Sequence, residues 1–164
     1  MNIAEDPDLY RPGGLYPLQI GETLKDSRYK ILHKLGFGSW STVWLARDQL
    51  EPSYVSVKIV DGAGYDPHAI ELEVSHRLEK GDFTHPGRQF TTALLDEFVV
   101  ESPNGKHQCY VTDVAGPALT HPKGATYDNL KDARVLVAQV YKAIQYIHSC
   151  GVIHGGELLL SRLK

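Results

Sequence analysis

Hydrophobic and β-branched residues recur along the chain in five short runs, each bounded by Gly, Pro, Asn or Asp. Runs of this length and composition predict strands, here over residues 29–35, 42–47, 54–60, 91–100 and 107–112. The first three strands follow one another through short connections, so an antiparallel meander is expected. A Ser-Pro-Asn-Gly segment at 102–105 separates the last two and is typical of a hairpin turn.

Two helical patterns alternate with these strands. The first is predicted over residues 66–80, because Asp-Pro is typical of a helix N-terminus and a glycine follows at 81. The second is predicted over 129–150 and ends at Gly151; its apolar residues at helical spacing are Leu130, Val137, Val140, Tyr141, Ile144 and Ile147. Three strands, a helix, two strands and a long helix predict an α+β fold with a five-stranded antiparallel sheet.

The first 26 residues have a different composition, rich in Pro, Gly and Asp, and they are predicted to form an extended arm without a packed element. A chain of 164 residues is long enough for one domain and too short for two well-packed ones. We therefore expect an arm at 1–26, one domain at 27–155 and a divergent tail at 156–164.

Charge and hydropathy exclude several classes of partner. The chain has 17 basic and 20 acidic residues, a net charge of −3, which predicts no nucleic-acid or membrane-surface partner because such partners require a basic excess. No apolar run approaches the ~20 residues of a membrane span, and the start does not resemble a signal peptide, so a soluble intracellular protein is expected. The eight histidines form no cluster with zinc-ligand spacing, and no protein-bound metal is assigned.

A glycine-bearing segment joins the first two predicted strands, and its residues are Gly36, Phe37, Gly38, Ser39, Trp40 and Ser41. Glycines let a backbone approach a polyphosphate closely, and N–H groups in such a turn solvate its charge. A dinucleotide-binding fold would place a helix after the glycines, whereas residues 42–46 have the composition of a strand. The glycines therefore cap a hairpin, which is either a phosphate-binding loop or a purely structural turn.

Lys58 lies in an otherwise apolar run, Val-Ser-Val-Lys, on the third predicted strand. Desolvating a lysine in such a run is unfavourable unless an anion pairs with it, and phosphates together with a helix carboxylate would be suitable partners. The alternative is a lysine on the solvent face of an alternating strand. Its position one short turn after the glycine hairpin favours the phosphate interpretation.

Two glutamates early in the following helix could supply the carboxylate for Lys58, namely Glu71 and Glu73. Glu71 is preferred because positions 71, 74, 75 and 78 share one helix face, which includes the apolar residue Leu78. Glu73 is expected on the solvated side of the helix, although the sequence leaves both open.

These three features together resemble the small lobe of eukaryotic serine/threonine protein kinases. Residues 35–45 (Leu-Gly-Phe-Gly-Ser-Trp-Ser-Thr-Val-Trp-Leu) are most similar to the SR-protein kinases, whose loop also has serine in place of the third glycine, here Ser41. Residues 10–21 resemble the arm that leads into those kinases, especially the fungal ones. His-Pro-Gly-Arg at 85–88 and Leu-Leu-Asp-Glu-Phe at 94–98 are similar as well, so the resemblance covers roughly residues 10–155.

The resemblance implies a small lobe at 27–112, a hinge at 113–116 and the start of a large lobe at 117–155. It also implies ATP binding, with Mg²⁺ in an intact relative, and phosphorylation of Arg/Ser-rich protein substrates in the cytoplasm or nucleus. Thr112 matches the gatekeeper, and Ser56 stands where the family usually has alanine. The implied ATP-binding residues are Leu35, Gly36, Phe37, Gly38, Ser39, Val43, Ser56, Lys58, Glu71, Asp113 and Ala115. Among them, residues 113–115 bind the adenine through their backbone, and residues 35, 43 and 56 line its pocket.

The sequence departs from the family pattern after Ile153, His154 and Gly155, which match the start of the catalytic loop. Gly156 occupies the place of the catalytic aspartate, and the metal-binding asparagine and the Asp-Phe-Gly segment have no counterpart. The resemblance therefore implies a kinase truncated within its catalytic loop and inactive as a catalyst. A non-catalytic nucleotide-binding or decoy module and a non-functional product are the alternatives. A nicotinamide-dependent oxidoreductase is disfavoured by the strand that follows the glycines.

Overall fold

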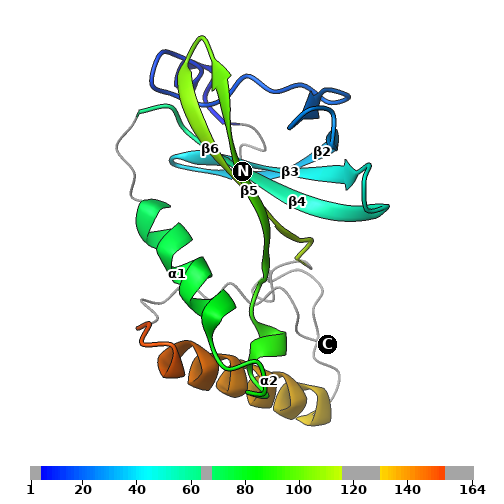
Figure 1. Ribbon diagram of the computed structural model, residues 1–164, viewed down its shortest axis with the longest axis vertical. Coiled ribbons are helices and arrows are strands. Elements are labelled where there is room, and N and C mark those ends of the chain that lie inside the picture. The colour runs from blue at the N-terminus through cyan, green and yellow to red at the C-terminus, as the bar shows by residue number, and fades with distance from the viewer. Residues whose placement is uncertain (1–4, 64–67, 116–129, 154–164) are drawn as a thin grey trace. The chain divides into compact units, whose positions relative to one another are not determined.

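The structure is a computed structural model that describes residues 5–63, 68–115 and 130–153 (Figure 1). It contains two compact units. The sheet unit comprises the described residues up to Leu72 together with Leu94–Val114, and the helical unit comprises Glu73–Ala93 and the described residues from Ala115 onward. No helix in the described part of the chain has the length and hydropathy needed to cross a bilayer.

Six antiparallel strands form one sheet in the order β1-β2-β3-β4-β6-β5. Their bounds are β1 Thr23–Leu24, β2 Tyr29–Gly38, β3 Ser41–Asp48, β4 Ser53–Val60, β5 Leu94–Ser102 and β6 Gly105–Asp113. The five predicted strands are confirmed. The sheet nevertheless has six strands rather than five, because the two residues of β1 pair with the start of β2. A strand of two residues is too short to show the alternation by which strands are recognised.

The two ends of β5 differ in how well their positions follow from the sequence. β5 begins at Leu94, later than the predicted residue 91, and is preceded by a 3-10 turn, η2, at Arg88–Phe90. At its other end Ser102 lies opposite Gly105, so a two-residue turn joins β5 to β6. Gly105 has a φ of 135°, a conformation that favours glycine. The predicted hairpin is therefore confirmed.

One face of the sheet carries a hydrophobic core. The buried members of this core are Leu18, Leu24, Tyr29, Ile31, Trp44, Ala46, Val55, Val57, Ile59, Cys109 and Val111. Leu18 precedes the sheet, and Leu24 lies in the short strand β1, so the N-terminal segment packs instead of forming an unpacked arm. Burying each of these two leucines contributes about 1.5–3 kcal/mol. Gly21 and the polar residues between Leu18 and Leu24 interrupt any continuous pattern, which explains why the packing was not predicted.

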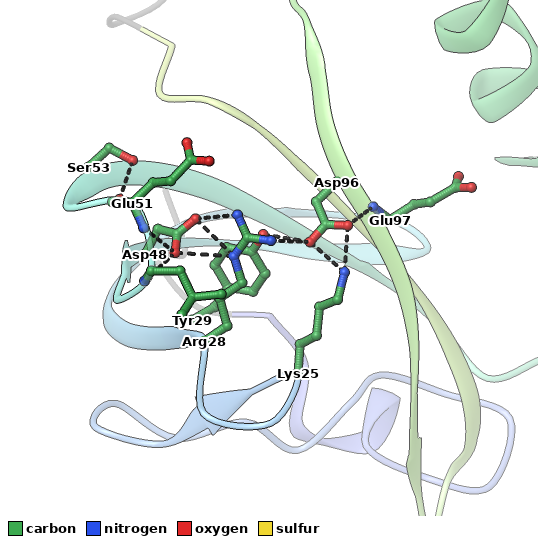
Figure 2. Close-up of polar contacts among 9 residues, drawn as sticks. Lys25, Arg28, Tyr29, Asp48, Glu51, Ser53, Asp96 and Glu97 are labelled. Atoms are coloured by element: carbon green, nitrogen blue, oxygen red, sulfur yellow. Dashed lines mark hydrogen bonds and ion pairs between the residues drawn. The ribbon is translucent and has the colours of Figure 1, made fainter.

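A cluster of charged and polar side chains fastens the turn before β2 to β3 and β5 (Figure 2). The carboxylate of Asp96 accepts hydrogen bonds from Lys25 Nζ and from the hydroxyl group of Tyr29, each at 2.6 Å. Arg28 binds Asp48 at 2.8 Å and Asp96 at 3.4 Å. Asp96 and its lysine partner are 71 residues apart in sequence. The cluster therefore links the turn between β1 and β2 to β5, which stands at the other end of the strand order.

The helical unit contains η2, part of α1 and all of α2; α1 spans His68–Lys80 and α2 spans Leu130–Ser149. The two predicted helices are thus confirmed, while the predicted cap at Asp66 and Pro67 lies outside the described residues. Gly151 ends α2 as predicted. It has a φ of 73°, and the next N–H group, that of Val152, donates to the carbonyl of Ile147 at 3.2 Å.

The buried face of α2 differs from the predicted one. Ala143, Tyr146 and Ile147 are its buried residues, at the i, i+3, i+4 spacing of one helix face. Val137 and Tyr141, which the spacing placed in the same apolar stripe, are 67% and 62% exposed. Tyr146 contacts elements distant in sequence, and single-helix periodicity does not reveal such a contact.

The His-Pro-Gly-Arg motif at 85–88 joins α1 to η2 and α2. The Arg88 guanidinium donates hydrogen bonds to the carbonyls of Leu78, Glu79 and Gly81 at 2.9–3.3 Å, so it caps the C-terminal end of α1. It also donates to the hydroxyl group of Tyr146 at 3.0 Å. A Cβ atom on Gly87 would lie 1.9 Å from the carbonyl oxygen of Lys142. The motif therefore requires both a glycine and an arginine.

Candidate functional site

The glycine segment forms the end of the β2–β3 hairpin. Gly38 lies opposite Ser41, so Ser39 and Trp40 form a two-residue turn. β3 follows directly, which confirms that a strand and not a helix comes after the glycines. The N–H group of Asp61 donates to the carbonyl of Trp40 at 2.9 Å and links the tip of this hairpin to the end of β4.

The strand register places Gly36, Val43, Ser56 and Lys58 on one face of the sheet, whereas Phe37 lies opposite Thr42 and therefore on the other face. Residues directly opposite each other in an antiparallel pair point to the same face. Gly36 lies opposite Val43, and Val43 lies opposite Lys58, which forms one row. In the adjacent row Leu45 lies opposite Ser56, and Ser56 lies opposite Thr112. We call this surface the Lys58 face; the hydrophobic core occupies the opposite face.

Lys58 is paired with Glu71. Its ammonium nitrogen lies 2.9 and 2.6 Å from the two carboxylate oxygens of Glu71, and the two side chains are 26% and 32% exposed. Glu73 instead accepts a hydrogen bond from Arg77 at 2.7 Å, one helical turn away, with both side chains more than half exposed. The structure therefore places the preferred glutamate beside Lys58 and the alternative on the solvated side.

The glycine loop leaves room above the Lys58 face. A Cβ atom added to Gly36 would have no described atom within 4 Å, in contrast to the crowded Gly87. Leu35 lies beside Gly36 at an irregularity in the β2–β3 register and is 46% exposed. An apolar side chain exposed next to open space is suited to contact a planar ligand. Phe37 is 42% exposed, but it lies opposite Thr42 on the core face and is not on the Lys58 face as the resemblance implied.

The residues implied for the hinge lie at the end of β6. Asp113 is the last residue of this strand and pairs with Val55 of β4. Thr112 donates a hydrogen bond from its hydroxyl group to the carbonyl of Asp113 at 3.2 Å. Val114 and Ala115 follow as exposed residues outside the ladder. The chain therefore leaves the sheet next to the pair formed by Ser56 and Thr112. The resemblance implies that residues 113–115, which follow this pair, contact the adenine.

Sequence patterns assign no role to Ser41 beyond its replacement of a glycine. In the structure Ser41 is buried and lies opposite Val60, in the row next to Val43 and Lys58. Its place on the Lys58 face follows from strand alternation alone, because it precedes Val43 by two residues. Of the residues that match the catalytic loop, His154, Gly155 and Gly156 lie outside the described residues.

An antiparallel sheet with a glycine hairpin, a lysine and a helix glutamate defines the small lobe of a protein kinase, and comparison with known proteins agrees. The chain is 34% identical to protein kinase dsk1 of Schizosaccharomyces pombe and 35% identical to mouse SRSF protein kinase 3, each over 92% of its length. It is 37% identical over 88% of its length to the serine/threonine-protein kinase SKY1 of Saccharomyces cerevisiae. No family model matches the sequence.

The crystal structure of the PF14_0431 kinase domain matches the fold, with a TM-score of 0.64 at 17% identity, over 81% of this chain and 38% of that one. The chain spans only 29%, 27% and 21% of dsk1, SRSF protein kinase 3 and SKY1. Over the residues it shares with these relatives, the chain belongs to the SR-protein-kinase family of serine/threonine kinases.

Proposed function

We propose that the Lys58 face binds ATP and that this chain provides the nucleotide-binding part of a serine/threonine protein kinase. The ion pair between Lys58 and Glu71 carries the proposal. Glu71 holds the ammonium group of Lys58 beside the glycine hairpin, where that group can neutralise adjacent phosphates. ATP would bring the transferable phosphoryl group, with Mg²⁺ bound to its phosphates, while the residues of this chain bind and orient the nucleotide.

The residues of the Lys58 face are arranged so that the phosphates of a nucleotide would lie at one end and its adenine at the other. The glycine hairpin and Lys58 lie at one end, and the open space over Gly36 lets a polyphosphate approach the backbone. Val43 and Ser56, with the exposed Leu35, would enclose the adenine. Residues 113–115 would bind its edge through their backbone, with the boundary between the lobes at this hinge.

The substrate proposal rests on the relatives. SRSF protein kinase 3 is a kinase whose name specifies SRSF proteins as its target, and we extend this to Arg/Ser-rich protein substrates for a kinase that contains this sequence. For the 164-residue chain itself, the proposed activity is nucleotide binding without phosphoryl transfer. Gly156 has no side chain that could accept the proton of a substrate hydroxyl group. For this chain the proposal therefore coincides with the non-catalytic nucleotide-binding module that the sequence offered as an alternative.

Titration with a fluorescent ATP analogue tests the binding proposal. Lys58→Met should weaken binding at least about tenfold, because a charge-assisted contact to phosphate is lost. Lys30→Met removes an exposed lysine from β2 and should bind like the unmodified chain. Equal binding by all three proteins would show that Lys58 does not contribute to the ATP-binding site. Incubation with labelled ATP and an Arg/Ser-rich peptide should give background phosphorylation only.

A further inference from the structure

Two buried serines flank the row that contains Val43 and Lys58. Ser41 is 6% exposed and Ser56 is 9% exposed. Ser41 precedes Val43 by two residues in β3, and Ser56 precedes Lys58 by two residues in β4. Two residues along a strand span about 7 Å. Because β3 and β4 are antiparallel, the two serines lie on opposite sides of the row, both on the Lys58 face.

Neither serine hydroxyl group has a hydrogen-bond partner within the described residues. The two buried threonines differ in this respect. Thr42 accepts a hydrogen bond from the indole N–H of Trp44 at 2.9 Å, and Thr91 donates to the carbonyl of Arg88 at 2.8 Å. Buried hydroxyl groups in proteins are normally satisfied, and an unsatisfied one is unfavourable.

Both hydroxyl groups, which have no partner among the described residues, thus lie on the face proposed to bind a nucleotide. The Oγ atom of Ser41 faces the side of Gly38 where a Cβ atom would lie, at 3.6 Å from that position. It is therefore on the underside of the glycine hairpin. Ser56 lies opposite Thr112, the residue before Asp113. One hydroxyl group is placed at the polyphosphate end of the proposed site, and the other at the base end.

We propose that Ser41 and Ser56 are ligand-contacting residues whose hydroxyl groups donate hydrogen bonds to a bound nucleoside polyphosphate, Ser41 to a phosphate oxygen and Ser56 to an acceptor on the nucleoside. This inference rests on the proposed nucleotide binding and extends it. A nucleotide would supply the acceptors that the described residues do not. Serine at position 56, where the family usually has alanine, then contributes to the specificity of ligand binding.

The two roles that a buried hydroxyl group can have predict opposite effects of its removal. If it contacts the ligand, replacement by alanine removes an unsatisfied group, and the ligand-free chain should melt at the same temperature or higher. The same replacement should weaken ligand binding. If the hydroxyl group instead has a structural partner, alanine should lower the melting temperature. The sign of the change in melting temperature therefore separates a binding role from a structural one.

The experiment uses the full 164-residue chain, calorimetric titration with ATP and with adenosine, and thermal melting without ligand. Ser41→Ala should weaken ATP binding about fivefold to tenfold and leave adenosine binding unchanged. Ser56→Ala should weaken binding of both ligands by a similar factor. Ser53→Ala is the matched control, because Ser53 is an exposed residue of the same strand as Ser56 and bonds only the carbonyl of Glu51.

The outcomes separate this inference from the proposed function. If the unmodified chain binds ATP and both alanine variants bind it equally well, the inference is wrong and the proposed function stands. A lower melting temperature in either variant would also overturn it, because the hydroxyl group would then have a structural partner. If the unmodified chain binds neither ATP nor adenosine, the proposed function fails and the inference fails with it.

Discussion

Lys58 on β4 and Glu71 on α1 form a bidentate ion pair across 13 positions of sequence, with nitrogen–oxygen distances of 2.9 and 2.6 Å. The partner of Lys58 is thus Glu71, although Glu73 lies only two residues further along the same helix. Glu73 is occupied by Arg77 on the exposed side. The ion pair fixes the direction of the Lys58 side chain, and the proposed site depends on that direction.

Glu71→Gln should weaken ATP binding about threefold to tenfold, because the lysine loses the anion that orients it. Glu73→Gln provides a control that changes the same functional group on the same helix. It should leave ATP affinity unchanged, since an exposed i, i+4 ion pair contributes little. Competition titration against a fluorescent ATP analogue measures both. A larger loss in the Glu73 variant would show that the pairing is wrong.

Asp96→Asn should destabilise the sheet unit by about 1.5–3 kcal/mol, because the hydrogen bonds from Lys25 and Tyr29 lose the negative charge of an acceptor whose side chain is only 15% exposed. Glu101→Gln breaks an ion pair on the same strand whose partners are 71% and 78% exposed, and should cause no measurable change. Urea denaturation gives both free energies of unfolding. Similar values for the two variants would mean that the cluster in Figure 2 contributes no more than a surface pair.

The same cluster predicts how stability depends on pH. Hydrogen bonds from Arg28 hold the pKa of Asp48 below its ordinary value of 3.8, against the opposing effect of burial. Burial acts to raise the pKa of Asp96, but hydrogen bonds from Lys25 and Tyr29 outweigh it and leave that pKa lowered. A group whose pKa is lower in the folded chain stabilises it above the unfolded pKa, and this contribution disappears as the pH falls through the folded pKa.

The free energy of unfolding should therefore fall as the pH is lowered from about 5 towards 2. The Asp96→Asn variant should show a shallower decrease than the unmodified chain, because one of the two carboxylates no longer titrates. Comparing the two proteins at each pH cancels the contributions of groups that lie outside this cluster. Parallel curves would show that the pKa of Asp96 does not differ between the folded and unfolded chains.

Two glycine substitutions should distinguish effects on stability from effects on ATP binding. Gly87→Ala should destabilise the chain by about 1–3 kcal/mol, because its Cβ atom would lie 1.9 Å from the carbonyl oxygen of Lys142. Gly36→Ala places a methyl group in open space and should not lower the melting temperature. It should weaken ATP binding, because the methyl group lies on the Lys58 face. If Gly36→Ala binds ATP normally, the polyphosphate does not lie over Gly36.

Much of the sheet could be predicted because its strands carry local signals. The β-branched run that ends at Lys58 and the Ser-Pro-Asn-Gly turn before β6 are visible within a few residues of sequence. The N-terminal packing could not be predicted this way, because Pro17 and Gly21 interrupt the apolar residues around Leu18 and separate them from Leu24. The burial of both leucines depends on a sheet that forms from later parts of the chain.

The candidate site was predictable to the extent that it follows from strand alternation. Val43, Ser56 and Lys58 lie where their positions in β3 and β4 require. The choice of Glu71 over Glu73 depends on how α1 is rotated about its axis, which a 13-residue helix with few apolar residues specifies weakly. The sequence does not show whether the hydroxyl group of Ser41 has a hydrogen-bond partner. Only the structure shows that none of the described residues provides one.

The most direct test of the account is to locate the ligand on the sheet by ¹H–¹⁵N correlation spectra of the 164-residue chain with increasing ATP. Shift changes should be concentrated in the glycine hairpin, around Lys58, and at the end of β6, and should be small at Val57 and Ile59, whose side chains lie on the core face of β4. The Lys58→Met variant should lose these changes at the same ATP concentration. Changes confined to residues distant from the Lys58 face, or spectra unaffected by ATP, would contradict the account.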